Sequence, residues 1–159
     1  MNVLDVLKYG HGTVMRTVED FPRGGWNTPG AVGRWSPQDV IAHLTSFEWV
    51  LVDVLGKILD PGIDTPALDA YLAPDPVFND DQVARRANHS LDQLLAEYDS
   101  AHAQAMACAM RLTPDTWEQE GILPWYGAEY DLEDFVAYQY YGHKREHCGQ
   151  IAVFAGRFR

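Results

Sequence analysis

Apolar residues recur along this chain with the spacing of α-helices in four separate stretches, and nowhere do they alternate for long as in a β-strand. This pattern predicts an all-α fold. The first helix is expected over roughly residues 2–19, which the turn-rich sequence PRGGWNTPG follows. Its apolar residues form one stripe: Val3, Val6, Leu7, Val14 and Val18.

The second predicted helix has the clearest beginning in the sequence. Ser36 suits the N-cap position, Pro37 suits the first helical position, and Asp39 stands where a capping-box acid belongs. We therefore expect a helix from Pro37 to about Leu59.

The chain between the second and third helices is rich in proline, with prolines at positions 61, 66, 74 and 76. Proline disrupts helix interiors, so the stretch from Pro61 to Asn79 is predicted to be a long surface connection without regular helix, of the kind that can cover a site. The third helix should begin after the Asn79/Asp80 cap and continue to about Leu112. The sequence TPDTW then predicts a short extra turn capped by Thr113.

A fourth helix should start at Asp131 and run to the C-terminus. Gly142 and Gly149 lie seven residues apart on one face of it, which suggests a close helix contact or a pocket floor. Four long helices, with long loops between the second and third and between the third and fourth, predict a four-helix bundle. The length of the chain suits one domain over residues 1–159.

Charge and cysteine usage exclude several classes of partner. The formal net charge is −11, from 23 acidic and 12 basic side chains, and no Lys/Arg stripe occurs, so we expect no nucleic-acid partner. Cys108 and Cys148 fall in helical stretches, as free thiols in a reducing compartment do. The N-terminus lacks the features of a signal peptide, and no long apolar run occurs. These features predict no membrane partner and a cytoplasmic location.

Histidines at helical spacing suggest a metal site. His143 and His147 lie four residues apart in GHKREHCGQI, so both project from one helix face, while His43 lies on the apolar face of the second helix. Three imidazole ligands would leave one coordination position open for water or substrate, as in catalytic zinc sites. The spacing alone equally allows three ordinary histidines that hydrogen-bond to their neighbours.

The sequence offers no clear catalytic base beside these histidines. Glu48 is expected to point away from His43 as a solvated or interhelical charge, and Glu146 to be a surface acid that pairs with basic neighbours such as Lys144. Cys148 is better explained as a packed thiol than as a ligand. His11, His89 and His102 have no partner at metal-ligand spacing, although His102 could face the bundle as a minor pocket residue.

Aromatic residues could line a substrate cavity, but helical aromatics also suit a core or a dimer surface. They are Trp125, Tyr126, Tyr138, Tyr140 and Tyr141.

Two segments, RWSPQDVIAHLTSFEW and GHKREHCGQI, resemble the signature regions of the DinB/YfiT-like superfamily of four-helix-bundle proteins. The order of elements agrees, with one histidine on the second helix and a pair on the fourth. The resemblance implies a divalent metal, commonly zinc or nickel, held by His43, His143 and His147, and it implies a homodimer. Part of the first segment is also similar to a branch linked to colibactin self-resistance.

Relatives in this superfamily include thiol transferases and isomerases that use low-molecular-weight thiols, whereas the colibactin branch is associated with hydrolysis of an electrophile. The resemblance therefore implies an enzyme that adds water or such a thiol to a small electrophile, with a role in detoxification. Because substrates are set by loops that differ within one fold, two alternatives stay open. One is a bundle that binds or sequesters a ligand without catalysis, and the other is a bundle whose metal only joins its segments.

Overall fold

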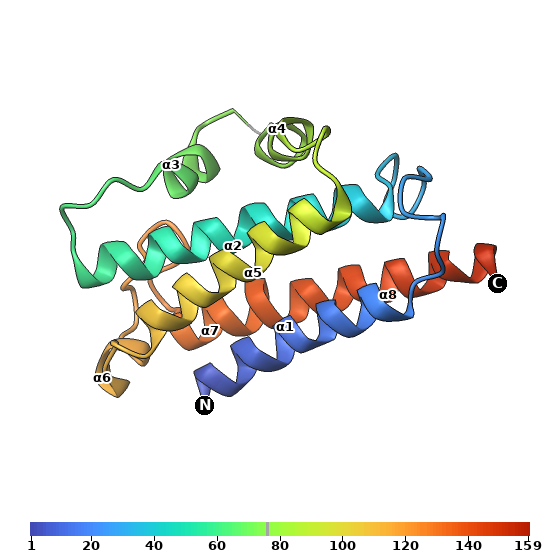
Figure 1. Cartoon of the computed structure of the whole chain (residues 1–159). Helices are drawn as coiled ribbons and strands as arrows, with labels where there is room; N and C mark the ends of the chain where they lie inside the picture. Colours follow the sequence, from blue (N-terminus) through green and yellow to red (C-terminus); the bar gives the residue numbers. More distant parts are fainter. Residues whose placement is uncertain (76) are drawn as a thin grey trace.

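The computed structural model describes residues 1–75 and 77–159 and confirms the predicted all-α four-helix bundle (Figure 1). The long helices are α1 (Val3–Asp20), α2 (Pro37–Leu59), α5 (Leu91–Ala109) and a last segment formed by α7 (Leu132–Val136), the π-helix η1 (Ala137–Gly142) and α8 (His143–Ala155). The short helices are α3 (Pro66–Leu72), α4 (Phe78–Arg85), α6 (Pro114–Trp117) and the 3₁₀ turn η2 (Gly156–Phe158). Within the described part of the chain, no helix combines the length and apolarity needed to cross a bilayer.

Local capping explains where the long helices begin. Ser36 and Asp39 form a reciprocal capping box, and α2 runs over the predicted residues. The last segment begins at a similar box between Asp131 and Asp134, and Thr113 caps α6 as predicted. These starts follow from side chains that bind the free N–H groups of a first turn, so they were readable from sequence.

The first helix lies parallel to the last segment. The N-terminal ammonium group of Met1 contacts Glu133 at 3.1 Å, and Arg159 donates to the carbonyl of Asp20 at 3.0 Å, so both ends of α1 meet the corresponding ends of its neighbour. The helix α2 runs antiparallel to this pair, as Figure 1 shows. The bundle is thus built from two parallel pairs of opposite direction.

The second pair, α2 and α5, is also parallel, and this explains the long connection between them. Gln38 donates to the His89 carbonyl at 2.8 Å near the start of both helices, and the Trp49 indole donates to Glu97 at 2.9 Å further along. A helix of 23 residues spans about 35 Å, which the chain must retrace before α5 can begin. In Figure 1 the connection that carries α3 and α4 returns along α2.

Two expectations about this connection are wrong. The stretch from Pro61 to Asn79 contains the helix α3, because Pro66 occupies the first turn, where its missing N–H group costs nothing. The single third helix is instead α4 and α5, separated by residues 86–90. Ser90 ends the break, since it forms a capping box with Gln93 at the start of α5.

Gly10 of α1 lies in close contact with the backbone of η1. A methyl group at Gly10 would lie 2.5 Å from the carbonyl oxygen of Tyr140, so only glycine lets α1 approach η1 this closely. The contact predicted at Gly142 and Gly149 is wrong: both are exposed, nothing lies near a methyl group at Gly149, and Gly142 meets only its own segment.

Replacing Gly10 by alanine should therefore destabilise the protein. We expect the Gly10→Ala variant to lose about 1–3 kcal/mol of unfolding free energy, the usual cost of overpacking, measured by urea denaturation. Gly12→Ala is the matched control on the same helix, because nothing lies within 4 Å of the added methyl group. It should gain about 0.5–1 kcal/mol from helix propensity. Equal stability of the two variants would contradict the close contact.

Candidate metal centre

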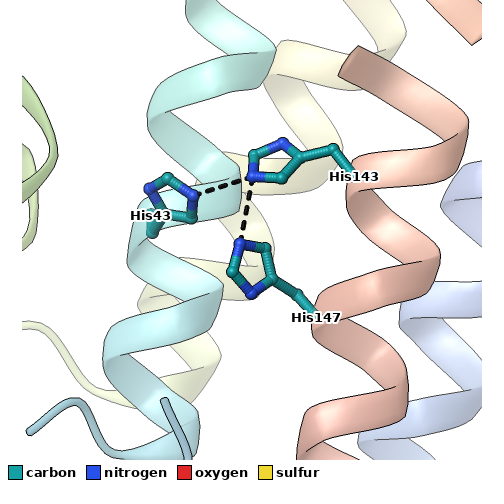
Figure 2. A group of neighbouring side chains, drawn as sticks. All are labelled: His43, His143 and His147. Atoms are coloured by element: carbon teal, nitrogen blue, oxygen red, sulfur yellow. Dashed lines mark hydrogen bonds between the residues drawn. The ribbon is translucent and has the colours of Figure 1, made fainter. Parts of the chain in front are cut away.

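The structure brings His43 of α2 together with His143 and His147 of α8 (Figure 2). The Nε2 atoms of His43 and His143 are 3.0 Å apart, and those of His143 and His147 are also 3.0 Å apart. All three predicted residues therefore point their ring nitrogens at one place. Among the described residues, no cysteine, aspartate or glutamate joins this group.

The surroundings keep the three rings neutral. Burial, then the neighbouring rings of His143 and His147, lowers the pKa of His43 to about 3. Burial and the ring of His147 lower the pKa of His143 to about 4, although the Gln139 backbone partly opposes this. The pKa of His147 is also lowered, mainly by burial. Near pH 7 all three imidazoles are uncharged, which is the form that binds metal ions.

A hydrogen bond fixes the tautomer of His147. Its Nδ1 atom lies 2.8 Å from Oε1 of Gln150, an acceptor, so Nδ1 carries the proton and donates it. The Nε2 atom of His147 must then present its lone pair to the other two rings. Metal-ligating histidines commonly have such a partner, which holds the ring in place.

No placement of protons makes hydrogen bonds of both 3.0 Å contacts between the Nε2 atoms. Because His147 presents a lone pair, the Nε2–H group of His143 would have to donate to it, and a protonated Nε2 has no lone pair left for His43. One N–H group cannot point along both contacts. A single cation among three lone pairs would satisfy all of them. Tetrahedral zinc, at about 2.0–2.1 Å from each nitrogen, would separate the nitrogens by about 3.3 Å, close to the 3.0 Å of these two contacts.

Aromatic side chains enclose the cluster. The ring of Trp35 lies 5.0 Å from His43, and the ring of Phe47 lies 5.0 Å from His43 and 4.8 Å from His143. Tyr71 of α3 and Phe78 of α4 pack edge-on against Phe47. The connection after α2 thus packs two further aromatic rings behind Phe47, as expected of a loop that covers a site.

The acidic residues considered as bases do not join the cluster. Glu48 is buried and pairs across the bundle with Lys144, so the interhelical alternative holds. Glu146 is exposed, and the expected pairing with Lys144 is wrong because Lys144 is buried against Glu48. Cys148 is a buried free thiol whose pKa is raised mainly by burial, which confirms a packed side chain.

The remaining candidates lie elsewhere. His102 stacks on His11 with ring centroids 4.0 Å apart, away from the three-histidine cluster. Tyr140 is buried and donates its hydroxyl proton to the Phe47 carbonyl at 2.8 Å, whereas Tyr138 is 75% exposed. Tyr140 therefore belongs to the core and Tyr138 to the surface, whereas Trp125 lines a cavity farther along α2.

The π-helix beside the site could not be predicted from the sequence, whereas the partner of His147 could. The π-helix η1 ends directly before His143, and its wider turns change the direction in which α8 presents its side chains. No residue pattern marks such a turn. Gln150, in contrast, lies three residues after His147 on the same face and was readable as an inward polar residue.

Comparison with known families adds an independent finding. A family model described as the DinB superfamily matches residues 9–151, a span that includes all three histidines. No curated protein and no solved structure matches the chain.

The metal-free protein should lose stability as the pH falls below about 6.5. An unfolded histidine titrates near that value, whereas folded His43 titrates at about 3 and His143 at about 4, so acid favours the unfolded chain. Each such histidine should cost about 1.4 kcal/mol per pH unit between pH 6 and 4.5. Urea titrations should therefore give a shallower pH slope for His43→Leu than for the natural chain. An identical slope would contradict a buried neutral His43.

Proposed function

Because the chain belongs to the DinB superfamily, we propose that its three histidines hold a divalent metal ion and that it is an enzyme acting on a small electrophile. In this proposal the nucleophile is water or a low-molecular-weight thiol, and the role is detoxification. Zinc or nickel is the proposed metal, since imidazole nitrogen suits both. The homodimer and the cytoplasmic location stay predictions.

The main observation in support of this proposal is that the Nε2 atoms of the three histidines lie close together. Side chains supply three nitrogens and, within the described residues, no fourth ligand, which is the donor set of sites that keep a position open for water or substrate. A bound divalent ion with an open position lowers the pKa of water or stabilises a thiolate. The net charge of −11 favours attraction of a cation.

The protein's own residues would bind and orient. Gln150 holds the His147 ring with its Nε2 lone pair inward, and the rings of Trp35 and Phe47 keep bulk water from two sides of the cluster. Exclusion of water strengthens electrostatic interactions inside a site. His143 is only partly buried, so substrate access would be on its side.

The absence of a carboxylate from the cluster, within the described residues, restricts the chemistry. Glu48 cannot serve as a base at the histidines, since its carboxylate is held by Lys144. Reactions whose nucleophile needs no separate protein base fit this site best. Addition of a metal-activated thiol or water to a reactive electrophile meets that condition.

Metal content tests the assignment directly. Protein purified without an affinity tag should contain about one divalent ion per chain, measured by mass spectrometry of the metals. The variants His43→Ala and His147→Ala should lose the ion, because two remaining nitrogens bind far more weakly. His89→Ala is a matched control from outside the cluster, because its ring lies beside Glu97, and it should keep the ion. Stoichiometric metal in His43→Ala and His147→Ala would exclude this ligand set.

A cavity far along α2 favours a second candidate, a bundle that sequesters a ligand without catalysis. The cavity has a volume of about 630 Å³, within the range of small-molecule sites. Most of its lining is apolar, including Val54, Ile58, Leu68, Leu123 and Trp125. Such a site would retain an apolar ligand without any general base.

Turnover separates the two candidates. With a thiol and a model electrophile such as 1-chloro-2,4-dinitrobenzene, an enzyme should release product in molar excess over protein, and His147→Ala should abolish the excess. A sequestering protein should instead bind one ligand per chain and saturate. Saturation without turnover in metal-loaded protein, across several thiols and in water alone, would favour sequestration.

A further inference from the structure

Glu48 and Lys144 form an ion pair in the interior of the bundle, between α2 and α8. Both side chains are 0% exposed, and the Lys144 ammonium group contacts Oε1 of Glu48 directly. The ammonium group also lies over the rings of Tyr98 and Tyr140, at 5.3 and 5.9 Å from their centroids. Charged residues are rarely buried so completely, and the three-histidine cluster does not use this pair.

Lys144 is the cation that balances Glu48. Nδ1 of His102 lies 3.9 Å from Oε2 of Glu48, but burial, then the nearby His11 and Lys144, lowers the pKa of His102 to about 3. His102 is therefore neutral near pH 7. Among the described residues, no other cationic group lies within 4.0 Å of the Glu48 carboxylate.

The ion pair lies beside the metal-site residues on both helices. Lys144 directly follows His143, and Glu48 directly follows Phe47, whose ring contacts both His43 and His143. The Phe47 carbonyl in turn accepts the hydroxyl proton of Tyr140. Any shift of α8 that separates the charges would thus also move His143 relative to His43.

The energy of the buried ion pair suits a role in fixing how α2 and α8 align along each other better than a role in overall stability. Desolvation offsets most of the attraction in a buried pair, and apolar replacements of both partners are often equally stable. Separating the partners is strongly unfavourable, however, because each charge then lies in the core unpaired. A slide of α8 by one turn, about 5.4 Å, would separate them. Registers of these two helices that separate the two charges are therefore unfavourable in free energy.

We propose that Glu48 and Lys144 are positioning residues, which set the register of α2 against α8 and so bring Nε2 of His43 opposite those of His143 and His147. This inference rests on the proposed metal function for its consequence, but the placement of the rings is a property of the chain alone. Apolar residues could stabilise the same helix contact without fixing its register.

The double variant Glu48→Met/Lys144→Met tests this positioning role. It should fold, with a melting temperature at least as high as that of either single variant, yet bind Zn²⁺ at least tenfold more weakly in competition with a chromophoric chelator. Should it not fold, the neutral pair Glu48→Gln/Lys144→Met, which retains more of the original shape, replaces it. Wild-type Zn²⁺ affinity in the folded double variant would overturn the proposal.

The matched control is Leu94→Ala, which removes a buried side chain from α5, a helix that carries neither partner of the ion pair and none of the three clustered histidines. It should lower the melting temperature and keep the Zn²⁺ affinity, so lost stability alone would not explain weak binding. Weaker binding by the control equal to that of the double variant would also overturn the proposal.

A second readout needs no metal. In nitrogen-15 spectra of the metal-free protein, the imidazole signals of His43 and His143 should move in the double variant and stay in place in Leu94→Ala. Unmoved signals in the folded double variant would refute a positioning role. If the natural chain bound no metal while these signals moved, the proposed function would fail and the positioning role would stand.

Discussion

The antiparallel contact between α2 and the last helical segment is the constraint on which the candidate site depends. Three interactions cross it within a short distance: the histidine cluster, the hydrogen bond from Tyr140 to the Phe47 carbonyl, and the buried ion pair between Glu48 and Lys144. Helix packing alone tolerates many registers, because ridges repeat every turn. Polar partners in an apolar core allow few registers, since each polar group must meet its counterpart or remain unpaired.

Other parts of the fold support this contact. Gly10 lets α1 lie close against η1, the middle part of the last segment, directly before His143. The parallel arrangement of α2 and α5 requires a connection that retraces the length of α2, and α3 and α4 of that connection place Tyr71 and Phe78 behind Phe47. The topology of the bundle therefore brings covering residues to the site without any dedicated domain.

The sequence predicted those features that depend on local chemistry. The capping box at Ser36 determined where α2 begins, and the four-residue spacing of His143 and His147 placed both on one helix face. Features set by distant contacts were missed. A π-helix and the partners of Glu48 and Lys144 depend on packing between helices, and a charged residue in an amphipathic pattern is normally assigned to the surface.

X-ray absorption spectroscopy of the metal-loaded protein tests the central claim most directly, because it measures the atoms around the ion. The account predicts three imidazole ligands with metal–nitrogen distances of about 2.0–2.1 Å for zinc and a remaining oxygen ligand from solvent. Addition of a small thiol should replace that oxygen by a sulfur at about 2.3 Å if a thiolate is the nucleophile, and leave it unchanged if water is. A sulfur ligand before any thiol is added, or fewer than three imidazoles, would contradict a site built from His43, His143 and His147.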